Sequence, residues 1–314
     1  MGTKTEKILQ KGWVVSLLAT FCCLLWGSAF PSIKVGYEWF RIGSSDTAAQ
    51  ILFAGMRFAL AGVLVILLGS LLQREFLRPR LSSLPRIGKI CLMQTVIQYF
   101  FFYVGLAHTT GVKGSIVESS NVFFAILFSS LLFRQEKMSG KKLLGCIVGF
   151  AGVVLVNLGG GGEDLRLQSG DIYILISAAA YGMSSVLIKK YSQWENPVML
   201  SGYQFLAGGL LMMAGAFAAG GRITVFTPAG GAILLYMALI SAVAYTLWGV
   251  LLKYNPVSRV SIFGFTNPVF GVLLSALILH EGGSFGMTGV AALVLVCAGI
   301  FIVNYERQGK KTES

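Results

Sequence analysis

Two opposite charges inside apolar stretches are the residues of this sequence best suited to chemistry. Arg57 lies within the apolar stretch 48–72, and Glu118 lies within the stretch 113–133. At the α-helical rise Arg57 sits roughly 13 Å into its stretch and Glu118 roughly 8 Å, so the two side chains could meet. A charge inside a membrane span costs several kcal/mol, so one that persists normally faces protein or water. Three interpretations are open: a structural ion pair, contact of one or both charges with a polar substrate or a coupling proton, or an interfacial position of Glu118.

Several other polar and aromatic side chains recur at helical spacing within the apolar stretches, so each group shares one face of a helix. A membrane helix accommodates such groups where neighbouring helices or water satisfy them. For any one residue, interhelical hydrogen bonding or core packing is an alternative to substrate contact, but as a set they predict an aromatic, mildly polar central cavity. The groups are Gln94 with Gln98, Glu118 with Asn121, and Ser241 with Tyr245 and Trp248.

Residues for enzymatic or metal chemistry are not gathered in this sequence. The five cysteines lie within apolar stretches without a CxxC motif, and neither histidine has metal-ligand spacing, so no metal and no cofactor are expected. Carboxylates such as Glu136 and Glu281 are scattered singly, whereas an enzyme would need paired carboxylates or a metal cluster. The sequence therefore predicts that the protein is not an enzyme. A membrane-embedded enzyme, such as a lipid transferase, and a non-transporting scaffold or sensor are the rival classes.

The elements that must position these residues are membrane-spanning helices. Of the 314 residues 55% are hydrophobic and 12% are charged, and the mean hydropathy is +0.74, whereas soluble domains are about a quarter charged. Apolar stretches of about 18 residues or more recur, which predicts a polytopic membrane protein with too little other chain for a large catalytic domain. The predicted spans are 13–34, 48–72, 88–107, 113–133, 140–158, 170–190, 197–220, 230–252, 257–279 and 285–304.

The distribution of positive charge predicts the orientation of these spans. If the N-terminus is cytoplasmic, most of the 25 Lys and Arg residues fall on the cytoplasmic side, as the positive-inside rule requires. We therefore expect an integral protein of the cytoplasmic membrane with both termini in the cytoplasm and an uncleaved first span. The basic segment 74–89 then contacts anionic lipid, so the net charge of +12 does not indicate a nucleic-acid partner. The positive residues assigned to the outer side are Lys34, Arg41, Lys113, Arg166 and Arg222.

The chain contains an internal repeat. The segment WGSAFPSIK at 26–34 resembles YGMSSVLIK at 181–189, and AGVVLVN at 151–157 resembles AGIFIVN at 298–304. Each copy holds five spans, and an odd number gives the two copies opposite orientations. Inverted repeats recur in secondary transporters, which expose a midplane site alternately to the two sides of the membrane. The predicted units are a first repeat 1–158, a linker 159–169, a second repeat 170–305 and a cytoplasmic tail 306–314. The linker includes the run Gly159 to Gly162, which lacks the GK[ST] of a phosphate loop.

Repeat-related residues that face the centre should meet near the midplane of the membrane. The repeat pairs Trp26 with Tyr181, Arg57 with Gln204, Tyr99 with Tyr245, and Asn121 with Asn267. Together with the helical faces these pairs predict the lining of a cavity for a small-molecule substrate. The candidate lining residues are Trp26, Arg57, Gln94, Gln98, Glu118, Asn121, Tyr181, Gln204, Tyr245, Trp248 and Asn267.

A stripe of small residues runs along the fifth span. Gly145, Gly149 and Gly152 occupy one face of this predicted helix. Small residues let helix backbones approach closely, so the stripe predicts tight packing between the two halves or between the protomers of a homodimer.

Four short motifs occur in order along the two copies: WGSAF at 26–30 with Lys34, Arg57-Phe58, FRQE at 133–136 before Gly145, and NPVFGVLLSALILHE at 267–281. Together they resemble the EamA-type permeases of the drug/metabolite transporter superfamily, over residues 13–304. In one departure, Asn121-Val122-Phe123 stands where the family often has a proline, as at Pro268. We therefore expect the two halves to bend unequally.

The resemblance implies an all-α polytopic membrane protein with ten transmembrane helices arranged as two inverted five-helix repeats. It also implies a secondary transporter or permease that moves a small polar or amphipathic metabolite by alternating access. The substrate class it suggests is an amino acid or a related compound, and the direction is export. A nucleotide-sugar or organophosphate carrier of the same fold is the alternative.

Overall fold

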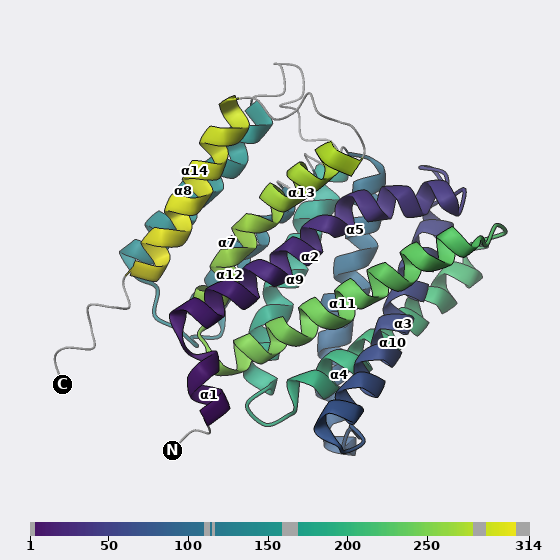
Figure 1. Cartoon of the computed structure of the whole chain (residues 1–314), viewed down its shortest axis with the longest axis horizontal. Helices are drawn as coiled ribbons and strands as arrows, with labels where there is room; N and C mark the ends of the chain where they lie inside the picture. The colour runs from purple at the N-terminus through teal and green to yellow at the C-terminus, as the bar shows by residue number, and fades with distance from the viewer. Residues whose placement is uncertain (1–3, 110–113, 115–116, 159–168, 279–286, 306–314) are drawn as a thin grey trace.

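The chain folds into a bundle of helices (Figure 1). The computed structural model describes residues 4–109, 114, 117–158, 169–278 and 287–305. Every regular element in these ranges is a helix, so the prediction of an all-helical protein is confirmed. The predicted linker apart from Ser169, the tail 306–314 and Glu281 lie outside the described residues.

The helices follow the apolar stretches of the sequence. The first half forms α1 (Lys4–Leu9), α2 (Gly12–Trp39), α3 (Thr47–Gln73), η1 (Leu81–Ser83), α4 (Leu84–Ile90), η2 (Cys91–Ile97), α5 (Gln98–Ala107), α7 (Asn121–Leu127), η3 (Phe128–Leu132) and α8 (Gly140–Leu158). The second half forms α9 (Ser169–Tyr191), α10 (Pro197–Ala218), α11 (Pro228–Tyr254), α12 (Val257–Ser261), η4 (Ile262–Phe265), α13 (Thr266–Ile278) and α14 (Met287–Tyr305).

Six helical stretches of the described chain are long and apolar enough to cross a membrane. They are Gly12–Trp39, Thr47–Gln73, Leu81–Ala107, Ser169–Tyr191, Pro197–Ala218 and Pro228–Tyr254. The other four predicted ranges also contain helix, in the segments α7 with η3, α8, α12 through α13, and α14. The outer surface exposes large apolar side chains such as Trp13 and Leu72, which suits contact with lipid rather than water.

Three of the long helices begin at side-chain caps. Asp46 accepts a hydrogen bond from the backbone N–H of Ala49 at 2.9 Å at the start of α3. Asn196 and Thr227 cap α10 and α11 in the same way, and each is followed by a proline at the first helical position. A cap satisfies a backbone N–H that has no partner within the helix, and proline there loses no hydrogen bond. The loop residues therefore fix where these helices start.

The fourth and ninth predicted spans are interrupted helices. In the first copy a turn at 119–120 precedes α7, and the π-helical segment η3 follows it. In the second copy the 3-10 turn η4 separates α12 from α13, and Pro268 lies in the first turn of α13. The interruption thus occurs in both copies although only the second has a proline there. The two halves differ in the kind of interruption.

Packing between the two copies is reciprocal. Helix α2 of the first copy packs against α11 and α13 of the second, and α9 of the second packs against α5 and α7 of the first. Matching glycines allow this: a Cβ at Gly27 would lie 2.5 Å from Cβ of Phe270, and a Cβ at Gly182 would lie 2.7 Å from Cβ of Phe124. Gly27 corresponds to Gly182 and Phe124 to Phe270 in the repeat. The contacts that join the copies therefore occur twice, once in each direction.

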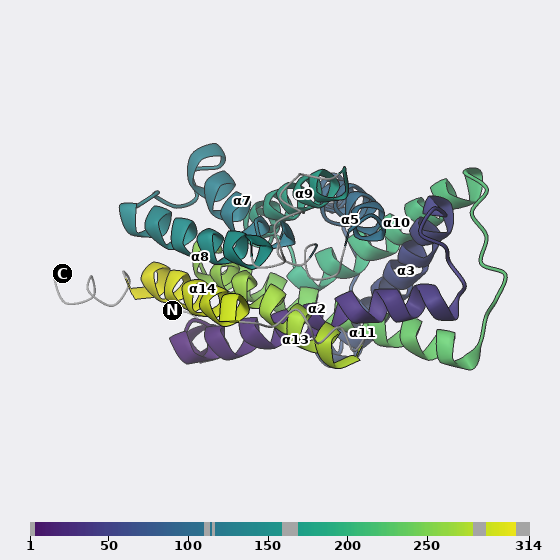
Figure 2. The same cartoon turned by 90° about the horizontal axis from the view of Figure 1, so that it is seen from above.

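The small-residue stripe of α8 packs within the chain. Helices α8 and α14 lie side by side (Figure 2). A Cβ at Gly145 would overlap Val303, and a Cβ at Gly299 would lie 2.6 Å from the carbonyl oxygen of Gly145. Of the two interpretations of the stripe, packing between the halves is therefore the one that the structure shows for Gly145, and a homodimer stays a prediction.

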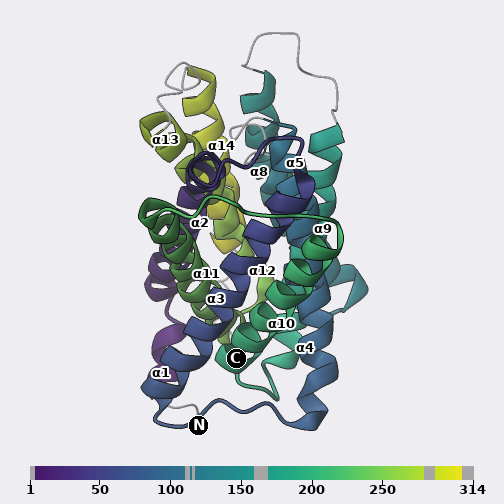
Figure 3. The ribbon, with the colours of Figure 1, turned by 90° about the vertical axis from the view of Figure 1, so that its right-hand side faces the viewer.

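One end of the bundle, which we call the α1 end, carries α1 (Figure 3, near the bottom). The start of α12 lies at this end because Arg259 bonds to the residue that follows α1, and the loop 133–139 bonds to α12 through Glu136 and Ser258. Asn255 Nδ2 donates to the Leu9 carbonyl at 3.0 Å, and Arg259 donates to the Gln10 carbonyl at 3.1 Å. A layer of fully buried aliphatic side chains, formed by Leu251, Leu252, Val257 and Val260, lies at this end. The α1 end is therefore closed by apolar packing and by hydrogen bonds.

Candidate functional site

A cavity lies between the two copies of the repeat. The unfilled space measures about 540 Å³, including its open side. Its wall is contributed by α2, α3, α5, α7 and the residues before it, α9, α11, η4 and α13. The lining residues are Trp26, Ala29, Phe30, Ile33, Arg57, Gln98, Tyr99, Phe102, Glu118, Asn121, Tyr181, Tyr245, Gly264 and Asn267. Most of the residues predicted to line a cavity are therefore brought together.

Aromatic rings from both copies form one wall. The ring of Trp26 lies 5.9 Å from that of Tyr181 and 4.9 Å from that of Tyr245, measured between centroids. The hydroxyls of Tyr99 and Tyr245 are hydrogen-bonded to each other. The prediction that repeat-related residues meet is thus confirmed for the pairs Trp26 with Tyr181 and Tyr99 with Tyr245. Rings at these spacings have favourable edge-to-face contacts, which hold the wall in place.

Arg57 is held by three protein acceptors. Its Nε donates to the carbonyl oxygen of Met237 at 3.2 Å and to Oγ of Ser241 at 3.1 Å, and its Nη1 donates to the hydroxyl of Tyr103 at 3.1 Å. The guanidinium carbon also lies 5.0 Å from the centre of the Phe58 ring, a cation–π distance. The side chain is 1% exposed and still forms part of the cavity wall. Arg57 is therefore a fixed positive charge in the wall.

Glu118 has an oxygen with no protein partner. The residue is 5% exposed and lines the cavity, and its Oε2 accepts no hydrogen bond in the described part of the chain. No hydrogen bond or ion pair joins Glu118 to Arg57 among the described residues; the described partners of the guanidinium are Met237, Ser241 and Tyr103. Among the described residues the structure thus shows no ion pair between Glu118 and Arg57, and it leaves a buried carboxyl group in the cavity wall.

Four further polar atoms of the lining are buried without a hydrogen-bond partner in the described chain. They are Nε1 of Trp26, Oε1 of Gln98, the hydroxyl of Tyr181 and Oδ1 of Asn267. Buried polar groups are nearly always hydrogen-bonded, and each one left without a partner costs about 1–3 kcal/mol. Donors and acceptors from both copies therefore converge on one space that a polar ligand can satisfy.

Three candidates from the sequence do not line the cavity. Gln204 accepts a hydrogen bond from Thr95, and Trp248 packs behind Trp26 with ring centroids 4.9 Å apart. Gln94 lies in the π-helical segment η2, whereas Gln98 begins α5 and lines the cavity. Gln94 is buried away from the lining.

The sequence analysis also missed several lining residues. Ala29, Phe30 and Ile33 follow Trp26 at the spacing of one helical face, and Phe102 follows Gln98 by four residues. Apolar residues at helical spacing do not stand out in an apolar helix, but extending the face of a polar candidate would have found them. Within the described chain no three His, Cys, Asp or Glu side chains gather where they could hold a metal ion.

Comparison with known proteins identifies the family. The model of the EamA-like transporter family matches residues 13–158 and again residues 168–305, so the chain belongs to this family and is an integral membrane protein. The resemblance inferred from the motifs is confirmed.

Individual relatives are also named as transporters. The chain is 24% identical over 311 residues to the "Uncharacterized transporter YvbV" of Bacillus subtilis, covering 94% of this chain and 93% of that protein. It is 28% identical over 265 residues to the "Uncharacterized inner membrane transporter YedA" of Escherichia coli K12, covering 80% and 78%. A solved crystal structure that is 16% identical superposes with a TM-score of 0.73 over 94% of this chain and 98% of that one, which supports the fold.

Proposed function

We propose that this protein is a secondary transporter that moves a small amphipathic metabolite, an amino acid or a related compound, by alternating access. The observation that carries the proposal is the cavity between the two copies, whose lining contains several buried polar atoms without a described partner, among them one oxygen of Glu118. Transporters of inverted-repeat architecture bind their substrates at such an interface between repeats. Homologues named as transporters support the same class of function.

The charges of the wall suit a zwitterion. The free oxygen of Glu118 can accept a hydrogen bond from a protonated amine, and the fixed positive charge of Arg57 favours a carboxylate on the same molecule. The rings of Trp26, Phe30 and Phe102 offer an apolar surface for the rest of the substrate. An organophosphate would require more positive charge, because Arg57 is the one cationic side chain among the described lining residues.

The reciprocal packing supports two inverted five-helix repeats with ten spans in all. We take the first repeat as 1–158 and the second as 170–305, joined by the linker 159–169 and followed by a tail at 306–314. With both termini in the cytoplasm, the α1 end is the cytoplasmic end, and the cavity serves export across the cytoplasmic membrane.

Transport by the purified protein in liposomes tests the proposal. Counterflow of radiolabelled amino acids should exceed that of phosphate esters, and Glu118→Gln should raise the KM for the transported compound by about 10- to 100-fold, since a hydrogen bond between charged groups is lost. Glu75→Gln, on an exposed loop, is the matched control and should transport normally. Absence of counterflow for every amino acid in the panel, or an unchanged KM in Glu118→Gln, would refute the assignment.

A further inference from the structure

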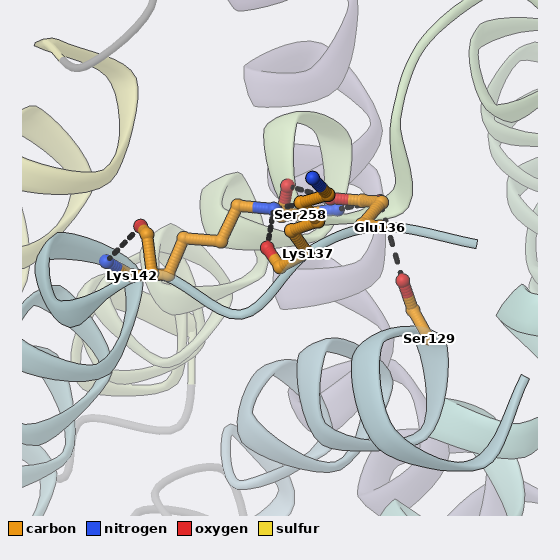
Figure 4. Close-up of polar contacts among 6 residues, drawn as sticks. Ser129, Glu136, Lys137, Lys142 and Ser258 are labelled. Atoms are coloured by element: carbon orange, nitrogen blue, oxygen red, sulfur yellow. Dashed lines mark hydrogen bonds and ion pairs between the residues drawn. The ribbon is translucent and has the colours of Figure 1, made fainter. Parts of the chain in front are cut away.

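Glu136, at the end of the FRQE motif, joins the two copies at the α1 end of the molecule. It follows η3 of the first copy, and its carboxylate accepts hydrogen bonds from the backbone N–H of Ser258 at 3.0 Å and from the Ser258 hydroxyl (Figure 4). Ser258 belongs to α12 of the second copy. The neighbouring Gln135 donates to the carbonyl oxygen of Val186 in α9, also in the second copy, at 3.2 Å. The loop 133–139 thus contacts two helices of the other repeat.

The carboxylate of Glu136 is held in its charged form. Lys142 Nζ lies 2.7 Å from Oε2, and the Ser129 hydroxyl lies 3.3 Å from Oε1. The side chain is only 9% exposed. Burial raises the pKa of Glu136, but the hydrogen bonds from Lys142 and Ser258 and the charge of Lys142 outweigh it, so the pKa lies below its usual value. Losing one partner of a buried, charged contact strongly destabilises a protein. Because donors from η3, α8 and α12 meet at Glu136, its loss would loosen the packing of all three elements.

The segment that Glu136 holds leads directly to the cavity. Helix α12 continues into η4, and Gly264 of η4 and Asn267 of α13 line the cavity. The start of α12 also supplies two side chains of the buried aliphatic layer, Val257 and Val260. A displacement of α12 away from the loop 133–139 would therefore open this layer and give the cavity a path to the α1 end.

A purely local role would predict different partners. An anchor for the loop after η3 would need contacts only within the first copy, such as those to Ser129 and Lys142. The bonds to Ser258 instead cross to the second copy and fix the segment nearest the cavity. A transporter that switches between two states needs contacts that form in one state and break in the other. The contact between Glu136 and Ser258 lies where such a contact is needed, between the two copies and next to the segment that leads to the cavity.

We propose that the contact between Glu136 and Ser258 is a latch that keeps the α1 end of the cavity closed, and that its release admits solvent from this end. The latch rests on the proposed alternating access. It assigns to the FRQE motif a role in setting the balance between the two states, separate from substrate binding.

Two native cysteines report on the latch. Cys23 Sγ donates to the carbonyl oxygen of Phe263 in η4 at 3.2 Å, and Cys22 contacts the carbonyl of Ala244 in α11. Both are fully buried on α2, toward the α1 end from Trp26. Movement of α12 and η4 would uncover them. Cys91, which is also buried but lies on the third span, serves as an internal reference for general unfolding.

The experiment measures modification of each cysteine by N-ethylmaleimide in the full chain in lipid nanodiscs, with no substrate present. In Glu136→Gln, Cys22 and Cys23 should react about tenfold faster than in the wild type, because a bond to a charged group is lost. Cys91 should react at the wild-type rate. Glu75→Gln, which removes an exposed carboxylate, should leave all three rates unchanged.

Ser258→Ala is the second variant, since it keeps the ion pair with Lys142 and removes only the hydroxyl that bridges the copies. It should accelerate Cys22 and Cys23 by about threefold, the smaller effect of a single neutral donor. The latch is overturned if both variants react at wild-type rates, or if Cys91 accelerates equally, which indicates general unfolding. Because the readout needs no transport, a latch that responds in a protein without counterflow would overturn the proposed function alone.

Discussion

The two copies of the repeat share their packing but not their charge. The first copy carries Arg57 where the second has Gln204, and the spacing that pairs Asn121 with Asn267 pairs Glu118 with Gly264. Both Glu118 and Gly264 line the cavity. The helix contacts and glycines, in contrast, occur in both copies. The packing is therefore repeated in both copies whereas the charges are not, which is the difference expected if the charges serve the proposed transport.

Labelling introduced cysteines from one side of the membrane at a time is the strongest test of this comparison, because each cysteine is either labelled or not. Glu75 and Arg222 are exposed and occupy corresponding positions in the two copies. In a Cys297→Ala background, a membrane-impermeant maleimide should label Glu75→Cys only from the cytoplasmic side and Arg222→Cys only from outside. Labelling of both from one side would contradict the inverted repeat.

Exchanging the residues of the Arg57 and Gln204 pair should have the next largest effect. Gln204→Arg places a charge at a fully buried site with no described anion beside it, which should cost about 3–5 kcal/mol and lower the thermal unfolding midpoint strongly. Gln204→Met, as control, should change it little. Arg57→Gln should remain folded, because the other copy has an amide side chain at the corresponding position. Its transport rate should fall at least tenfold, because roughly one hydrogen bond to a charged group is lost. Equal tolerance of both exchanges would show that the charge asymmetry has no function.

The paired glycines test whether the two copies share their packing. Gly27→Ala and Gly182→Ala each push a methyl group into a phenylalanine of the opposite copy, so both should destabilise the protein by a similar amount, about 1–3 kcal/mol. Gly215→Ala on α10, where a Cβ meets open space, should be neutral or slightly stabilising. Unfolding midpoints of the purified variants measure this. A large effect at one glycine alone would mean that the packing is not reciprocal.

The smallest effect concerns pH and the loop 133–139. Because the pKa of Glu136 is lowered in the folded protein, its stabilising effect is full at neutral pH and is lost as the pH falls through that lowered pKa. The unfolding midpoint of Glu136→Gln should lie a few degrees below wild type at pH 7. The difference should shrink as the pH falls below the ordinary Glu pKa of about 4.3 and should vanish below the lowered pKa of the folded protein. A difference that is constant over this range would mean that the charge of Glu136 is not what stabilises the contact.

The sequence predicts the helical fold well for two reasons. Long apolar stretches must become helices in lipid, and the duplicated motifs reveal which of them correspond. The π-helical segments η2 and η3 and the 3-10 turn η4 were not predicted. Such interruptions depend on how each helix packs against its neighbours, and no composition or periodicity of the local sequence marks them.

The candidate site could be predicted where the repeat and helical spacing agree. Trp26, Tyr181 and Tyr245 were found because both arguments select them. The partners of Arg57 could not be deduced, since Met237 acts through its backbone carbonyl and Tyr103 lies on another helix. A backbone acceptor carries no signature in a sequence. The bond between Glu136 and Ser258 escaped for a similar reason, because half of it involves a backbone N–H.

The reciprocal packing also has a consequence for biosynthesis. Cys23 of α2 bonds to Phe263, a residue 240 positions later in the chain. At ribosomal speeds of about 5–20 residues per second, α2 waits roughly 10–50 s in the membrane before its partners in η4 and α13 have been made. During this time its glycine face is open to lipid or to any helix that happens to be nearby. A nascent chain arrested before residue 260 would keep that face uncovered, so we expect truncated products to be targets of membrane quality control.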